Sequence, residues 1–255
     1  MYKSLTAEEH KKYFSLPQNY KVDGFLSYGA WDEEKHRDKI KKTLENMGIS
    51  YVSKTLEGFL YRILEITVDK KNYWFVVMYG GAMLSEYVHL ACLFGSKKNI
   101  HIGSCGGLHP EMQSLDFVIP TWSYGNESTT RVYDREAKDF KHFSDKKLSE
   151  LLEKNLANKY PLKKGPIMTN QAMMGETMDD VKLWSKQGYY GVEMETATVF
   201  SVSKHFNVPA AALIYVSDNL IKGQTIGDES HTAQKEAREM IKNDIYKIGL
   251  TTLMS

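Results

Sequence analysis

Short apolar runs rich in β-branched and aromatic residues alternate with longer helical patterns along most of the chain. The runs that we predict to be strands are 24–28, 59–68, 73–79, 99–102, 116–120, 165–168 and 210–216. The predicted helices are 84–94, 144–159, 177–187, 195–206 and 230–252. Alternation of this kind is typical of helices packed on a largely parallel sheet. We therefore predict a single-domain, three-layer α/β/α fold with a central mixed, mostly parallel sheet.

The composition of the chain limits the classes of partner that we expect for it. Its 255 residues include 33 Lys and Arg against 32 Asp and Glu. Nucleic acids and anionic membranes attract an excess of positive charge, so we expect neither as a partner. The N-terminal segment is polar and acidic, and no apolar run reaches the roughly 18 residues of a membrane span. We therefore expect a cytoplasmic protein.

No repeat, low-complexity tract or flexible linker divides the chain into modules. We predict one domain over residues 23–255, preceded by an arm of unknown role over residues 1–22. The arm either packs against a neighbouring subunit or is a mobile tail. Cys92 and Cys105 lie in apolar segments without a ligand-spaced partner, so we expect reduced thiols and no metal.

A glycine-rich segment, Gly103-Ser104-Cys105-Gly106-Gly107, directly follows the apolar run 99–102. We predict that the strand stops there and that backbone N–H groups and the Ser104 hydroxyl close on an anion. The segment lacks the lysine of a P-loop and the glycine spacing of a dinucleotide site. A tight turn that needs glycine conformations is the alternative.

Two carboxylates flank a methionine in Glu193-Met194-Glu195, just after the apolar pair Gly191-Val192. In a strand or turn both acids would face the same side, whereas a helix would separate them by about 200°. Such a carboxylate can accept two hydrogen bonds from a vicinal diol, which ribose offers. The alternative is a solvated first helical turn in which acids favour the helix dipole.

Ser217-Asp218-Asn219 ends the apolar run 210–216, which is typical of a strand buried on both faces. Open α/β sheets bind ligands at the carboxyl ends of their strands. Burial there would raise the pKa of Asp218 and let its carboxyl hold a proton for a leaving group. A helix cap or turn residue is the alternative.

Taken in order, these three segments resemble the nucleoside phosphorylase and nucleosidase superfamily, of the purine nucleoside phosphorylase and uridine phosphorylase type. Residues 102–108 look like the phosphate-side loop of that family, 191–197 are similar to its ribose motif, and 216–218 match the catalytic aspartate stretch of its purine-specific members. The resemblance covers residues 73–250 and implies a phosphorylase-like fold.

The resemblance also assigns roles around the nucleoside. It implies that Glu195 binds the ribose hydroxyls, that Met194 contacts the sugar beside Glu193, and that Val192 lines the base pocket. Met173 stands where the family places an aromatic residue on the base, and a methionine can pack there with softer geometry.

The same comparison implies the chemistry. Asp218 would protonate the purine N7 as the sugar becomes oxocarbenium-like, which is worth about a hundred- to ten-thousandfold in rate. Ser104 and Gly103 would hold the attacking phosphate, a co-substrate; no cofactor is implied. His101 stands where the family has an arginine, and Arg62 lies near a position from which some phosphorylase subunits lend an arginine to a neighbour.

The chain departs from the phosphorylases in its small number of arginines, which those enzymes use to bind phosphate. Its segment 29–34 resembles instead the opening loop of the hydrolytic nucleosidases, where Glu34 would activate water. A first helical turn rich in acids explains that segment equally well. His231 also replaces an arginine that often assists the aspartate.

Three functional hypotheses follow. We predict phosphorolysis of a nucleoside, preferably a purine nucleoside, to the free base and ribose 1-phosphate. Hydrolysis by water is the alternative, and binding or storage of a nucleoside without turnover is the third. Because the family builds its sites at subunit contacts, the resemblance also implies a homo-oligomer, as a dimer, trimer or hexamer.

Overall fold

One ten-stranded mixed sheet organises the molecule, whose computed structural model describes residues 2–255 apart from the side chain of Ser230. The order is β10-β6-β8-β9-β5-β1-β4-β3-β2, with β7 paired to β6. The strands are β1 Gly24–Gly29, β2 Val52–Thr55, β3 Ile63–Val68, β4 Lys71–Met78, β5 Asn99–Gly107, β6 Phe117–Asn126, β7 Lys141–Phe143, β8 Leu162–Asn170, β9 Gly191–Glu193 and β10 Ala210–Asn219. Parallel pairs join β4, β1, β5 and β10 at the centre, whereas β2 and β3 add antiparallel pairs at one edge.

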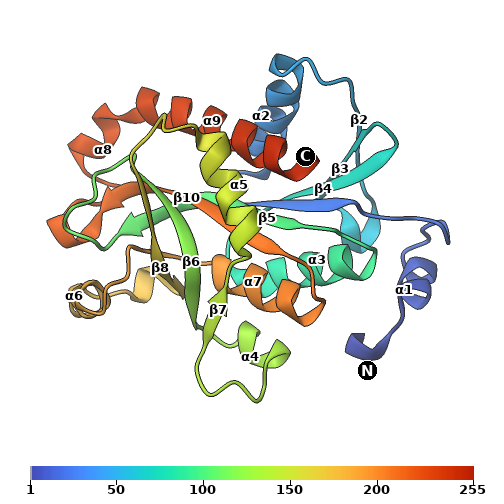
Figure 1. Cartoon of the computed structure of the whole chain (residues 1–255), viewed down its shortest axis with the longest axis horizontal. Coiled ribbons are helices and arrows are strands. Elements are labelled where there is room, and N and C mark those ends of the chain that lie inside the picture. The colour runs from blue at the N-terminus through green and yellow to red at the C-terminus, as the bar shows by residue number, and fades with distance from the viewer. Residues whose placement is uncertain (1) are drawn as a thin grey trace.

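Helices cover both faces of this sheet, as Figure 1 shows. The α-helices are α1 Ala7–Tyr13, α2 Glu33–Asn46, α3 Gly81–Leu93, α4 Thr129–Tyr133, α5 Lys146–Leu156, α6 Met178–Lys186, α7 Thr196–His205, α8 Glu229–Ala233 and α9 Lys235–Met254. Short 3-10 turns lie at Tyr2–Ser4, Gly58–Leu60, Met173–Gly175 and Leu220–Lys222. One apolar core joins the sheet to α2, α5 and α9, and a second joins it to α3 and α7. The predicted three-layer α/β/α fold is confirmed.

Strand β10 illustrates why both faces of the central sheet are apolar. Leu213 and Tyr215 pack into the core beneath α9, and the alternate residues Ile214 and Val216 pack into the core beneath α7. A strand buried on both faces reads as a continuous apolar run because successive side chains point to opposite sides. The run 210–216 was predicted from this property.

Part of the sheet closes on itself. Strand β10 pairs with both β6 and β5, so β5, β10, β6, β8 and β9 form a ring of five strands. Strand β5 belongs both to this ring and to the open part of the sheet. Its C-terminal half therefore has neighbours on two sides, β9 and β10.

The prediction that the strand stops at Gly103 is wrong, because β5 continues through Gly107. None of Gly103, Gly106 and Gly107 has a positive φ, so a tight turn is not the reason for these glycines. Two other boundaries also differ. The predicted strand 59–68 begins only at Ile63, because Phe59 and Leu60 belong to the 3-10 turn Gly58–Leu60, and the predicted helix 230–252 is divided at Gln234 into α8 and α9.

The predicted arm at residues 1–22 packs on the core of its own chain, except that Met1 lies outside the described residues. Tyr20 and Val22 are buried in the core beneath α3 and α7. The Tyr20 hydroxyl donates to the Glu65 carboxylate and accepts from Trp74 Nε1 at 2.8 Å. These contacts fasten the arm to β3 and β4.

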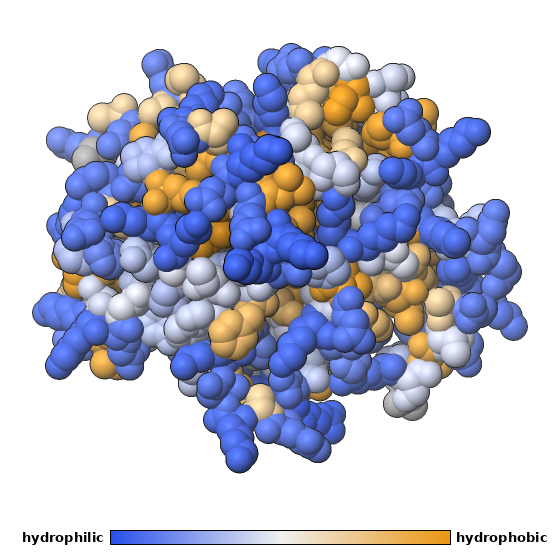
Figure 2. Space-filling view, in the orientation of Figure 1, coloured by the Kyte–Doolittle hydropathy of each residue, from blue (hydrophilic) through white to orange (hydrophobic). Residues whose placement is uncertain are grey.

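Hydrophilic side chains dominate the face of the molecule drawn in Figure 2, with smaller apolar areas between them. Over residues 2–255, no helix combines the length and the apolar character that crossing a membrane requires.

Candidate active site

Two segments that carry predicted site residues, β9 and β10, pair with the same residue of β5. Gly106 pairs with Val192 of β9 on one side and with Asp218 of β10 on the other. The next residue, Gly107, pairs in the same way with Gly191 and Asn219. The ribose motif and the strand-end aspartate, far apart in sequence, are therefore held on opposite sides of the same short segment.

Close packing explains the glycines at this crossing. A Cβ atom on Gly106 would lie 2.5 Å from Leu220 Cδ1, and one on Gly191 would lie 2.5 Å from Cys105 Sγ. Carbon atoms in contact lie about 3.5–4.0 Å apart, so neither position has room for a side chain. A β-bulge between Val216 and Asp218 shifts the register of β10 and brings Asp218 opposite Gly106.

Glu193 anchors the beginning of α7. Its Oε2 accepts from the backbone N–H groups of Glu195 at 2.9 Å and Thr196 at 2.8 Å, and from Thr196 Oγ1 at 2.9 Å. Its Oε1 accepts from Thr169 Oγ1 at 2.5 Å. The first N–H groups of a helix have no hydrogen-bond acceptor within the helix, and this buried carboxylate is the acceptor for two of them. Its acceptors are therefore occupied within the protein itself.

Glu195 is buried but has free acceptor capacity. It accepts from the Gly80 N–H at 2.5 Å and also from the Met194 N–H, and a Cβ atom on Gly29 would lie only 2.6 Å from its Oε2. Burial, and then the neighbouring Glu193, raise the pKa of Glu195 to about 8. The two acids face the same side, as predicted for a strand or turn, and the solvated helical turn is excluded because both are buried.

His101 lies between these acids. Its Nε2 is 3.7 Å from Glu193 Oε2 and 3.9 Å from Glu195 Oε2, and its Nδ1 is hydrogen-bonded to Ser27 Oγ at 2.9 Å. Burial lowers the pKa of His101 to about 3, so the ring is neutral at pH 7 and these contacts are not ion pairs. A neutral imidazole supplies much less attraction for phosphate than an arginine would.

The three side chains His101, Glu193 and Glu195 have the spacing of a metal cluster, since their ligand atoms lie within 4.8 Å of one another. Glu193 Oε2 already accepts three hydrogen bonds, however, which leaves it no lone pair for an ion. The donor set therefore fits hydrogen bonding better than coordination, and we assign no metal to it.

Asp218 lies at the end of β10 beside a small hollow. Burial raises the pKa of its carboxyl, whereas the Ser217 hydroxyl, which donates to Oδ1, lowers it. The hollow is lined by Ser114, Ser217, Asp218, Gln224, Thr225, His231 and Gln234. Asp218 is thus a buried acid next to an opening, as a proton donor to a bound base requires.

The side chains predicted to contact the base and sugar lie on or next to β9 and in the 3-10 turn after β8. Val192 is buried in a small apolar cluster, and Met194 is buried next to it. Met173 is half-buried, with its sulfur 3.7 Å from the Tyr79 hydroxyl. Gln171 accepts from the Gly81 N–H at 3.0 Å and donates to the Met194 carbonyl at 2.6 Å, so it joins α3 to the ribose motif.

Gln171 and the glycines that contact Glu195 were not predicted. Gln171 lies just beyond the end of β8, so its place after the predicted strand 165–168 was the signal available. Gly29 lets Glu195 approach the backbone closely, and Gly80 donates a backbone N–H to it. Neither role depends on a side chain, so the sequence gives no sign of it.

Ser104 lies on β5 opposite Tyr215 of β10. Burial raises the pKa of Tyr215, and hydrogen bonding to Ser104 and Tyr28 opposes that rise. Gly103 is buried one residue earlier, where a Cβ atom would lie 3.5 Å from His101 Nε2. Gly103, Ser104 and His101 are therefore brought together along one strand.

The structure does not bring Glu34 and Arg62 to this cluster. Glu34 is exposed in the first turn of α2 and lines a surface hollow with Asp38 and Lys42. Arg62 donates to Glu33 Oε2 at 3.0 Å and stacks on Tyr61. Both remain predictions as site residues.

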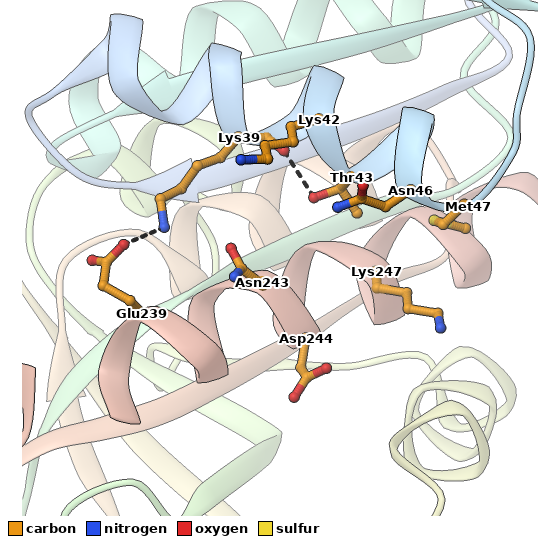
Figure 3. A pocket seen from close by; sticks show the side chains of 9 residues that line it. All are labelled: Lys39, Lys42, Thr43, Asn46, Met47, Glu239, Asn243, Asp244 and Lys247. Carbon is orange, nitrogen blue, oxygen red and sulfur yellow. Dashed lines mark hydrogen bonds and ion pairs between the residues drawn. The ribbon is translucent and has the colours of Figure 1, made fainter. Parts of the chain in front are cut away.

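A wider hollow of about 440 Å³ lies between α2 and α9, as Figure 3 shows. Its lining is polar and partly paired, because Lys39 donates to Glu239, and Asp244 accepts from Lys159. It contains none of the predicted site residues. Its position away from the strand ends gives it no place in the chemistry described above.

Comparison with known proteins agrees with the fold and the motifs. The model of the Phosphorylase superfamily matches residues 58–253. A DeoD-type purine nucleoside phosphorylase of Thermoanaerobacter sp. (strain X514) is 31% identical over 164 residues, which cover 64% of this chain and 70% of that protein. A second DeoD-type enzyme, from Vibrio parahaemolyticus, is 27% identical over 213 residues, covering 78% and 87%.

A solved structure has the same fold. The crystal structure of uridine phosphorylase from Vibrio fischeri ES114 superposes with a TM-score of 0.76 and covers 98% of each chain, at 16% sequence identity. The family match spans most of the chain and includes every segment of the strand crossing. The chain belongs to the phosphorylase superfamily.

Proposed function

We propose that the chain cleaves the N-glycosidic bond of a purine nucleoside by phosphorolysis, giving the free base and ribose 1-phosphate. One observation supports the proposal: Gly106 pairs with both β9 and β10, so the segment that leads into Glu195 and the segment that carries Asp218 lie on two sides of one short stretch of β5. A ribose clamp and a proton donor are the two groups that departure of a purine requires.

Glu195 and Asp218 each act at a defined step of the proposed reaction. The Glu195 carboxylate accepts hydrogen bonds from the ribose hydroxyls, since the Gly80 and Met194 N–H groups leave acceptor positions free. Asp218 donates its proton to N7 as the C1′–N9 bond breaks and its electron pair moves to the purine. A phosphate oxygen then bonds to C1′ of the oxocarbenium-like sugar. Relatives named purine nucleoside phosphorylases support the purine assignment.

Hydrolysis is the second candidate, and the scarcity of cations near β5 favours it. His101 is neutral, and the Arg62 guanidinium is paired with Glu33. In this mechanism a water molecule takes the place of phosphate and free ribose is released.

Product analysis with a panel of purine and pyrimidine nucleosides separates these functions. Ribose 1-phosphate formed only when phosphate is present supports phosphorolysis. Free ribose at equal rates with and without phosphate supports hydrolysis instead, and binding of a nucleoside without any product leaves the storage role.

Variants test the assigned groups. Asp218→Asn and Glu195→Ala should each reduce kcat/KM by about a hundredfold or more, because each removes a group that acts in the transition state. Asp139→Asn and Glu150→Gln alter exposed acids and serve as matched controls. Full activity of Asp218→Asn would exclude the proton-donor role.

We also propose that the protein assembles as a homo-oligomer in the cytoplasm. Exposed apolar side chains gather near the site, where the Trp31 ring lies 4.6 Å from that of Tyr79, which in turn contacts Met173. Exposed apolar clusters of this kind often mark protein interfaces. Light scattering at micromolar concentration is the test, and a monomer would contradict the proposal.

A further inference from the structure

Gln171 follows the end of β8, and its side-chain amide joins two segments that are far apart in sequence. Its Oε1 accepts from the Gly81 N–H, at the beginning of α3, at 3.0 Å. Its Nε2 donates to the carbonyl of Met194, between β9 and α7, at 2.6 Å. One side chain therefore fixes the separation between α3 and the turn from β9 to α7.

The backbone that Gln171 fixes is the backbone whose N–H groups reach Glu195. Gly80, next to Gly81, donates to Glu195 Oε1 at 2.5 Å, and Met194 also donates to this carboxylate. A shift of either partner of Gln171 would displace one of these donors. The amide of Gln171 thus acts on Glu195 through two backbone segments.

The turn at Gly80 needs such a tether. Gly80 has a φ of +89°, a region that favours glycine, and it has no side chain with which to cap α3. The first N–H groups of a helix have no acceptor within the helix, and Gln171 Oε1 is the acceptor for that of Gly81. A Cβ atom on Gly80 would lie only 3.2 Å from this oxygen, and one on Gly81 only 3.0 Å from Gln171 Nε2. The amide therefore restricts two otherwise permissive residues.

The amide group suits both of its partners. It carries one acceptor and one donor, and here the oxygen faces an N–H group while the nitrogen faces a carbonyl. A carboxylate would set an acceptor against the Met194 carbonyl, and an aliphatic side chain would remove both hydrogen bonds. Glutamine thus matches this bridge in length and in chemistry.

We infer that Gln171 is a positioning residue for the ribose clamp: it holds the Gly80 and Met194 N–H groups against Glu195, so that the remaining acceptor positions of that carboxylate face the sugar hydroxyls. Groups that bind a substrate need such support, because a displaced acceptor loses much of its affinity. The inference rests on the proposed role of Glu195 in nucleoside binding. It is independent of whether phosphate or water attacks the sugar.

Titration of the Glu195 carboxyl by NMR, in the full chain without ligand, tests the tether directly. Glu195→Gln identifies the resonance. Gln171→Met keeps the length of the side chain and removes both hydrogen bonds, so the N–H groups that favour the ionised carboxylate should be displaced. The acid ionisation constant of Glu195 should then fall about tenfold. Gln187→Met alters an exposed glutamine at the end of α6 and should leave this constant unchanged.

Calorimetry with adenosine and with 2′,3′-dideoxyadenosine tests the effect on the sugar. The measurements use Asp218→Asn protein, in which loss of the proton donor slows turnover. Adding Gln171→Met should weaken adenosine binding by about tenfold. It should weaken binding of the dideoxy analogue, which offers Glu195 neither the 2′ nor the 3′ hydroxyl, by less than about twofold. A general loss of packing would weaken both alike.

An unchanged ionisation constant of Glu195 in Gln171→Met, or an equal loss of affinity for the two nucleosides, would overturn the inference. If that variant does not fold, Gln171→Asn replaces it under the same criteria, because its amide is one methylene too short to span both partners. A shifted Glu195 in a protein that binds neither nucleoside would refute the proposed function and leave the effect of Gln171 on Glu195 intact.

Discussion

At the scale of single residues, the acid that we assign to ribose is protonated in the free protein near neutral pH. Burial, and then the neighbouring Glu193, raise the pKa of Glu195 to about 8, although hydrogen bonds from the Gly80 and Met194 N–H groups act to lower it. A ligand that brings two hydroxyl donors favours the ionised form. Nucleoside binding should therefore release a proton below pH 8.

The same shift predicts a pH-dependent stability. The folded protein retains the Glu195 proton between pH 4.5 and about 8, whereas the unfolded chain releases it, so the free energy of unfolding should fall across this window. Glu195→Gln cannot ionise and should escape this loss, becoming more stable than the wild type by roughly 3 to 5 kcal/mol above pH 8.

Urea unfolding of both proteins at pH 5 and at pH 8.5 measures this difference. The two stabilities should nearly coincide at pH 5. A constant gap at both pH values would show that the amide changes packing and that ionisation is not the cause.

At the scale of elements, Glu193 fixes where α7 begins. Glu193→Ala leaves the N–H groups of Glu195 and Thr196 and the Thr169 hydroxyl without their buried acceptor. We expect a loss of about 3 to 5 kcal/mol in the free energy of unfolding, as for other broken buried charge networks. Glu150→Ala, on the exposed side of α5, should change stability by less than about 0.5 kcal/mol.

Strand β9 depends on the space beside Gly191. Gly191→Ala would place a methyl group 2.5 Å from Cys105 Sγ and 3.3 Å from the Gly106 carbonyl. We expect a loss of about 1 to 3 kcal/mol by overpacking, together with weaker nucleoside binding. Cys105→Ala in the same chain should recover part of the stability, and Gly227→Ala, at an open position, should cost little. Additive effects of the two changes would show that they do not clash.

Sequence patterns predicted most of the long elements because their apolar periodicity is strong, as in 210–216, but the 14-residue helix α2 was not among the predicted helices. They missed β2, which is mostly exposed, and β7 and β9, each three residues long and too short to show a period. The segment 103–107 was misjudged for a different reason. Glycine there permits close strand packing, which depends on Leu220 and Cys105, and no local pattern records such long-range contacts.

Site residues divide in the same way. Glu195 and Asp218 were predicted as site residues because their motifs are local, and the structure shows that β9, which precedes Glu195, and β10, which carries Asp218, pair with the same segment of β5. Gln171 was not predicted, because its hydrogen bonds to the Gly81 N–H and the Met194 carbonyl join segments that are far apart in sequence.

At the scale of the whole molecule, the N-terminal arm should contribute to stability. Tyr20→Phe leaves Trp74 Nε1 and the buried Glu65 carboxylate without their shared hydroxyl. We expect the free energy of unfolding to fall by about 1 to 3 kcal/mol. Tyr2→Phe alters an exposed ring and should have no measurable effect. Equal stability of the two variants would mean that the hydroxyl of Tyr20 does not hold the arm.

The closed ring of β5, β10, β6, β8 and β9 also limits how this protein can diversify. A strand inside a ring cannot slip by one residue without displacing neighbours on both sides. The relative position of the proposed sugar clamp, Glu195, and the proposed proton donor, Asp218, is therefore fixed by the ring. New substrate preferences would have to arise in the segments outside the ring, such as 171–176 and 223–231, where substitutions and insertions leave the strand register untouched.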